Sequence, residues 1–139
     1  MRPSQHWHLF CLATTWWTLF FIAGLGSDYF QTAPLWAILL FGELMPAAAL
    51  GYFGWRRCSH APQQAWRSAF WIAFYMTVPL FFYDYLYLAV HQARGLSFLQ
   101  THWYLTAFYA IPWMLLPVIA WPVAANAANA VTKDKTYKK

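Results

Sequence analysis

Long apolar runs separated by short polar stretches set the pattern of this sequence. A transmembrane helix needs about 20 mostly apolar residues at a rise of about 1.5 Å per residue. Runs of about this length cover residues 9–25, 34–54, 68–90 and 102–124. The stretches between them are a turn at 26–33, a basic loop at 55–67 and a loop at 91–101. The pattern therefore predicts an all-α, integral membrane bundle of four transmembrane helices.

Prolines and small residues modify these predicted spans. The prolines inside them are Pro46, Pro79, Pro112, Pro117 and Pro122. Each lacks a backbone N–H and favours a kink. Ala47, Gly51 and Gly54 give the second span a smooth face for close helix packing.

The chain divides into one membrane domain, residues 1–125, and a basic tail, residues 126–139. The tail ends in KDKTYKK and offers few apolar side chains to bury. We therefore expect it to be disordered and solvated.

Positive charges are unevenly distributed across this four-span arrangement. Of the nine lysines and arginines, only Arg94 falls in a loop on the opposite side from the others. Positively charged residues collect on the cytoplasmic side of membrane proteins. Both termini are therefore expected to be cytoplasmic. Compact loops and the lack of sorting signals favour a bacterial inner membrane, with the endoplasmic reticulum membrane as the alternative.

Composition excludes several classes of protein. The chain of 139 residues is 61% hydrophobic and only 9% charged, whereas soluble domains carry about 25% charged residues. The net charge of +5 follows from membrane topology, so nucleic acid is not expected as a partner. Cys11 and Cys58 lie far apart, in a span and in a cytoplasmic loop, and a disulfide is not expected. The Cys/His spacing of a metal site is missing, and no metal or cofactor is expected.

Glu43 is the most informative residue, because it lies in the middle of the second apolar run. A charged carboxylate at bilayer depth costs roughly 3 kcal/mol or more. Glu43 must therefore be protonated, paired or facing a wet cavity, and an intramembrane acid indicates a functional site by default. Asp84 in the third run lies within about 5 Å of the same depth. The two carboxyl groups could meet and share a proton.

Helical spacing adds further polar residues to the candidate site. Side chains three, four or seven positions apart share a helix face, and lipid offers polar groups no partners. We therefore expect these polar stripes to face inward. The candidate ligand-binding residues are Asp28, Glu43, Asp84, Tyr87, His91, His102, Thr106 and Tyr109.

Each candidate also has a structural interpretation. Glu43 could be a protonated packing residue, and Asp84 could serve only in structural hydrogen bonding. His91 and His102 could be interfacial and solvated, and Asp28 could be a helix cap.

Short motifs in the chain resemble those of the EXPERA group of four-span membrane proteins, which includes the sigma-2 receptor and the emopamil-binding sterol isomerases. The matching positions are Asp28, Pro34, Trp36, Glu43 within FGEL, Tyr109, Pro112 and Pro117, ahead of a lysine-rich tail. The resemblance implies that Asp28 and Glu43 face a pocket for sterol-like or cationic amphiphilic molecules. The group's catalytic histidine and glutamate cannot be placed on this sequence, so the resemblance does not extend to isomerase activity.

The sequence leaves three hypotheses for function. The first is an intramembrane acidic pocket, lined by Glu43, Asp84, Tyr87, Tyr109 and Asp28, that binds a small hydrophobic, lipid-like or sterol-like molecule. If a reaction occurs there, proton transfer by a carboxyl group is the expected type. The second is a small proton-coupled transporter, acting as a homo-oligomer, with Glu43 as its protonation site. The third is an accessory or assembly subunit that pairs with a partner membrane protein.

Overall fold

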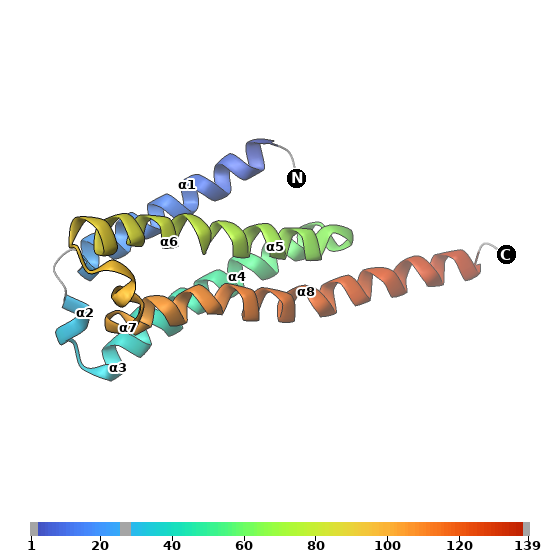
Figure 1. Ribbon diagram of the computed structural model, residues 1–139. Helices are drawn as coiled ribbons and strands as arrows, with labels where there is room; N and C mark the ends of the chain where they lie inside the picture. Colours follow the sequence, from blue (N-terminus) through green and yellow to red (C-terminus); the bar gives the residue numbers. More distant parts are fainter. Residues whose placement is uncertain (1–2, 26–28, 138–139) are drawn as a thin grey trace.

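The computed structural model describes residues 3–25 and 29–137. Within these ranges the regular elements are helices (Figure 1). The chain starts with α1 (Pro3–Phe20), η1 (Phe21–Leu25) and α2 (Tyr29–Thr32). A second rod contains α3 (Leu35–Ala37), η2 (Ile38–Leu44) and α4 (Met45–His60). A third contains η3 (Pro62–Gln64), α5 (Ala65–Tyr75), α6 (Val78–Asp84) and η4 (Tyr85–His91). The chain then forms η5 (Gly95–Ser97), α7 (Phe98–Thr101) and the long α8 (Trp103–Tyr137).

Three stretches in the described ranges are long and apolar enough to cross a membrane, at Leu35–His60, Pro62–His91 and Trp103–Lys133. They coincide with the second, third and fourth predicted spans. The prediction of an all-helical membrane protein is thus confirmed at this level. The first predicted span is helical as well, because it lies within α1 and η1.

The second and third rods and the long helix α8 form the centre of the bundle. Helix α5 packs against α8 and α4, α4 packs against α8, and α1 lies along α5 and α6. The start of α1, the turn between α4 and α5, and the end of α8 lie at the same end of the bundle (Figure 1). Helices α2, α3 and α7 lie at the opposite end.

Glycines let α4 and α8 approach closely. A Cβ atom on Gly51 would lie 3.4 Å from a methyl group of Leu115. A Cβ atom on Gly54 would overlap the side chain of Leu116, which is fully buried. The small-residue face predicted from the sequence is therefore the face that packs against α8.

The prolines have unequal effects. The third rod breaks at Met76 and Thr77, just ahead of Pro79, and helix resumes at Val78. Pro46 stands at the start of α4, where the missing N–H is tolerated. Pro112, Pro117 and Pro122 lie inside α8, which continues past them as one helix.

Two sequence expectations, one about the C-terminal residues and one about the stretch after the second span, are wrong. Residues 125–137 continue α8 instead of forming a disordered tail. Their alanine-rich composition explains this, since alanine is the strongest helix former. Helix α4 also extends through Cys58 to His60, where a loop was expected. The Cys58 thiol is buried and donates to the carbonyl oxygen of Ala65 at 3.5 Å, which ties α4 to the start of α5.

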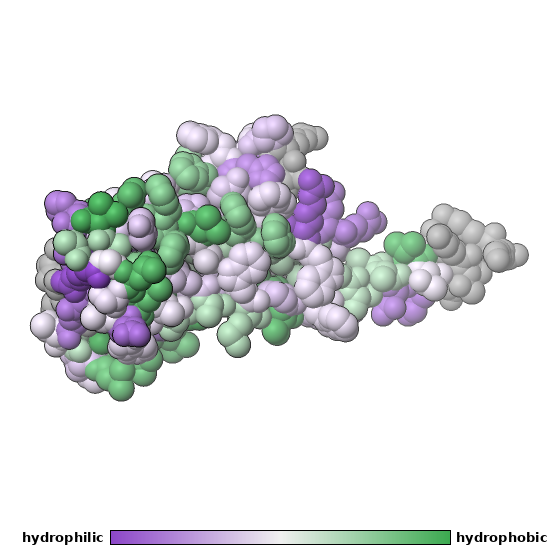
Figure 2. Space-filling model, in the orientation of Figure 1, coloured by the Kyte–Doolittle hydropathy of each residue, from purple (hydrophilic) through white to green (hydrophobic). Residues whose placement is uncertain are grey.

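The visible surface fits a membrane environment. Figure 2 shows apolar side chains over much of the bundle, with hydrophilic residues concentrated toward its two ends. Several large apolar side chains are highly exposed, including Ile22 in η1 and Met114 and Val118 in α8, at 71–74%. Exposing such an apolar surface to water would be unfavourable, whereas contact with lipid tails is compatible with it.

Candidate functional site

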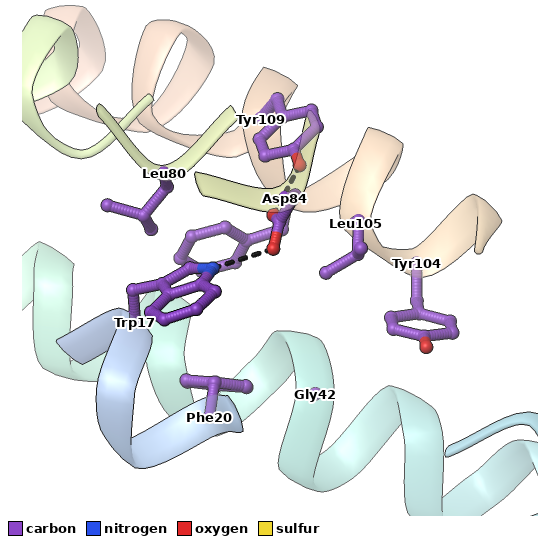
Figure 3. A pocket seen from close by; sticks show the side chains of 9 residues that line it. Trp17, Phe20, Gly42, Leu80, Asp84, Tyr104, Leu105 and Tyr109 are labelled. Atoms are coloured by element: carbon purple, nitrogen blue, oxygen red, sulfur yellow. Dashed lines mark hydrogen bonds between the residues drawn. The ribbon is translucent and has the colours of Figure 1, made fainter. Parts of the chain in front are cut away.

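Asp84 is the centre of the candidate site. Its side chain is 2% exposed. The indole Nε1–H of Trp17 donates to Oδ1 at 2.7 Å, and the hydroxyl of Tyr109 donates to Oδ2 at 2.5 Å (Figure 3). Each carboxyl oxygen thus has one neutral donor, and the three residues come from α6, α1 and α8. The carboxyl group is the point at which these helices are joined.

The local sequence explains why Asp84 points inward. Leu80, Asp84 and Leu88 follow one another at intervals of four, and all three are buried. Residues four apart lie on the same face of a helix. The apolar stripe therefore carries the acid into the bundle. Asp84 is also the last residue of α6 before the π-helical segment η4 begins.

A small cavity adjoins the carboxyl group. Its other walls are Trp17, Phe20, Gly42, Leu80, Tyr104, Leu105, Phe108 and Tyr109. The walls come from α1, η2, α6 and α8, with Gly42 contributed by η2 (Figure 3). The free volume is about 30 Å³. That space admits a water molecule, whereas pockets for whole small molecules measure about 300–1,000 Å³.

The chemistry of this site is that of one acceptor in an apolar enclosure. A carboxylate can accept about four hydrogen bonds, and the two protein donors account for only part of this capacity. A ligand bringing a hydroxyl or protonated amine would supply a further donor. Its remaining surface would have to be apolar to match the aromatic walls.

Glu43 lies beside this site but is not part of its wall. It is 8% exposed and belongs to the π-helical segment η2, next to the cavity-lining Gly42. Neither of its carboxyl oxygens has a hydrogen-bond partner in the part of the chain that the structure describes. The expected proton-sharing pair with Asp84 is therefore not formed. Buried carboxyl groups without hydrogen-bond partners are rare in proteins, and so are π-helical segments, which are frequent at functional sites. Glu43 combines the two features and therefore remains a candidate functional residue.

The remaining candidates separate into different places. Tyr109 joins Asp84 through its hydroxyl. The ring of Tyr87 packs edge-on against Phe21, with ring centroids 4.9 Å apart, and stacks with His91 at 5.8 Å. His91 is exposed, contrary to an inward-facing stripe. Asp28 lies outside the described residues.

Thr106 and His102 have structural partners at the end of the bundle near α7. The exposed Thr106 hydroxyl donates to the carbonyl oxygen of Leu99 at 2.8 Å. His102 is fully buried, so the interpretation of a solvated histidine is wrong. The side-chain amide of Gln31 donates to its Nε2 at 2.7 Å, and the Thr101 hydroxyl lies 3.1 Å from its Nδ1. These contacts bring α2 against the start of α8 and cover the ring.

Sequence reasoning left Trp17 out of the candidate site. A signal was present, because Trp17 lies in the middle of an apolar run and not near a span end, where interfacial tryptophans gather. A buried indole needs an acceptor for its N–H. An acid in another span was the acceptor to look for.

Comparison of the chain with family models, curated proteins and solved structures gives no match. Function is therefore inferred from the site geometry and the sequence.

Proposed function

We propose that the chain is a four-span membrane protein with both termini in the cytoplasm, in which α1 and η1 form the first span. Hydrogen bonds at three levels support this arrangement: His6 to Tyr75 at 3.3 Å, Thr14 to Tyr83 at 2.9 Å and Trp17 to Asp84 at 2.7 Å. A helix tied along its length to a membrane-spanning rod crosses the membrane with it. The distribution of lysine and arginine supports the orientation.

The function that the geometry supports best is binding of a small hydrophobic, lipid-like or sterol-like molecule at the Asp84 cavity. The observation that carries this proposal is a buried carboxyl group, held by Trp17 and Tyr109, at the wall of an otherwise apolar cavity. An intramembrane acid in such a place indicates a functional site. The ligand class is the one implied by the resemblance to the EXPERA group, with Asp84 as the acid that meets the ligand.

The size of the cavity defines how the ligand would enter. With about 30 Å³ free, the cavity accepts the polar end of a ligand only after wall side chains move. Phe20 on α1 and Phe108 on α8 are suited to this movement, because both rings line the cavity. Their ring centroids lie 6.1 Å apart. Rotation of these rings would widen the cavity while the Asp84 carboxyl group stays fixed by its two donors.

Native mass spectrometry of protein purified in mild detergent tests the proposal. We expect a discrete bound mass in the wild type that is lost in Asp84→Asn and in Gly42→Leu, which fills the cavity. Glu43→Gln is the matched control, because it neutralises a buried acid outside the cavity wall and should keep the bound mass. A bound mass unchanged in both Asp84→Asn and Gly42→Leu would rule out this site. Co-purification of a second protein without a small bound mass would favour the accessory-subunit hypothesis.

We also propose a second candidate function, a proton-coupled carrier, on the separate observation that Glu43 is buried without a hydrogen-bond partner in the described chain. A charged carboxylate there would cost roughly 3 kcal/mol or more, so Glu43 is expected to hold a proton at rest. Infrared spectroscopy of the reconstituted protein should show a protonated-carboxyl band that is absent from Glu43→Gln and shifts in D₂O. A band that does not shift in D₂O would mean that the proton is trapped, and the carrier proposal would fail.

A further inference from the structure

A groove runs between α1 and α4 on the side of α1 that faces away from its hydrogen-bonded partners. Its inner part is apolar and includes Leu12, Trp16, Ala49, Phe53 and Phe108. Its outer part, toward the end of the bundle with the chain's first helix turns, includes Ser4, His8 and Arg57. Leu12 and Phe53 line both parts, so the two parts adjoin at these side chains. We call this feature the α1–α4 groove.

The packing of α1 explains why the groove is open. The hydrogen bonds that join α1 to the third rod lead to Tyr75, Tyr83 and Asp84. Helix α1 is therefore held against α5 and α6, and its side toward α4 stays uncovered. The free volume is about 100 Å³ in the inner part and about 580 Å³ at the wide outer end.

The outer end has the chemistry of an anion site. Arg57 is half-buried and lines the groove, and no carboxylate lies against its guanidinium group in the part of the chain that the structure describes. The exposed side chains of Ser4 and His8 lie at the same mouth and can supply further hydrogen-bond donors. The neighbouring Arg56 differs, because it is exposed and lies over the ring of Tyr52 at 6.0 Å.

We propose that the α1–α4 groove binds one anionic phospholipid. The phosphate group lies at Arg57, with Ser4 and His8 beside it, and one acyl chain runs past Leu12 and Phe53 toward Trp16 and Phe108. Basic pockets between transmembrane helices at the cytoplasmic face bind anionic headgroups. A second protein helix fits less well, because the inner part is narrow and the outer end is polar and basic.

The preference for this lipid comes from the headgroup. An acyl chain gains little hydrophobic energy by moving from bulk lipid into the groove, because both surroundings are apolar. The phosphate gains a charge-assisted hydrogen bond from Arg57, and one such basic residue near the membrane surface changes affinity by about fivefold. The apolar inner part of the groove positions the acyl chain, and Arg57 favours a lipid with an anionic headgroup.

The test is native mass spectrometry of protein equilibrated in detergent with equal amounts of phosphatidylglycerol and phosphatidylcholine. We expect the wild type to retain one phosphatidylglycerol in preference. Arg57→Gln should weaken that retention by about fivefold. Arg56→Gln, which removes the same charge one residue away, should leave it unchanged. Ala49→Trp should reduce retention of both lipids, because Ala49 is an exposed residue whose larger replacement blocks the inner groove without entering the core.

Several results would overturn the proposal. Equal losses in Arg56→Gln and Arg57→Gln would show a general surface charge effect. Unchanged retention in Ala49→Trp would show that no acyl chain occupies the groove. Displacement by inorganic phosphate at low concentration would identify a phosphate site and not a lipid site. The Asp84 cavity is tested with different variants, so either proposal can fail alone.

Discussion

At the scale of single residues, the two buried acids differ in their hydrogen bonding. Asp84 has one donor on each oxygen, from Trp17 and from Tyr109. Glu43 has none in the described chain, although it is nearly as well buried. The partners of Asp84 fix the position of its carboxyl group, which suits binding of a ligand in a defined orientation. The environment of Glu43 lets its carboxyl group change state without disrupting a network.

Removing the Tyr109 hydroxyl should destabilise the protein measurably. Tyr109→Phe keeps the ring but leaves one oxygen of the buried Asp84 carboxyl group without its donor. We expect a loss of about 1 kcal/mol in the free energy of unfolding, as for other hydrogen bonds between membrane helices. Thermal unfolding in detergent measures the effect. Tyr52→Phe is the control, because Tyr52 is 60% exposed and its replacement should leave the melting temperature unchanged. Equal melting of wild type and Tyr109→Phe would mean that this bond does not contribute.

At the scale of helices, π-helical segments occur next to the site residues in three rods. Segment η1 follows Phe20, η2 contains Gly42 and Glu43, and η4 follows Asp84. A π-helical segment widens the helix and changes which face the later residues occupy. In the second rod, the change to α-helix at Met45 precedes the glycine face that packs on α8. The local irregularity therefore lets one rod serve both the cavity and a close helix contact.

The contact between α4 and α8 should not accept a side chain at Gly54. In Gly54→Ala the new methyl group would overlap the buried side chain of Leu116, and we expect a loss of about 1–3 kcal/mol from overpacking. Gly42→Ala is the matched control, because its Cβ atom meets only Ile38, at 3.8 Å. Denaturant or thermal unfolding in detergent compares the two. A Gly54→Ala variant as stable as Gly42→Ala would show that α4 and α8 are less tightly packed than described.

At the scale of the whole molecule, the bundle is a packed core of three rods with α1 attached along one side. The attachment of α1 forms the Asp84 site, since Trp17 closes it, and leaves the α1–α4 groove open. The two ends of the bundle also differ. The α4–α5 turn has arginines on either side, whereas the opposite end holds the buried His102 and the short helix α7.

Cysteine labelling checks the proposed orientation. In a variant without Cys11 and Cys58, single cysteines at Gln63 and Leu96 report on opposite ends of the bundle, and both positions are exposed. We expect Leu96→Cys in intact bacterial cells to react with a membrane-impermeant maleimide. Gln63→Cys should react only after the cells are permeabilised. The reverse result would invert the topology, and labelling of both positions from outside would contradict a cytoplasmic α4–α5 turn.

The sequence by itself determined the class of protein and the approximate positions of its helices. Apolar runs of membrane-spanning length form helices in lipid, because a helix pairs the backbone N–H and C=O groups within its own segment. The sequence also predicted the small-residue face of α4 and the inward placement of the Asp84 and Tyr109 side chains, since helical spacing and polarity indicate which side chains avoid lipid. It placed the end of the last helix too early, because apolarity marks the membrane boundary and not the end of helix formation.

Only the tertiary structure decided which residues meet. Trp17 and Asp84 are 67 positions apart, and periodicity along one helix does not say which neighbour that helix faces or how far it is rotated. π-Helical segments alter that rotation further. Glu43 belongs to one of them, η2, and lies beside the cavity wall without pairing with Asp84. The burial of His102 likewise required α2 to lie against the start of α8. Apolar patterning selects a helix and its buried face, whereas packing between helices selects the partners.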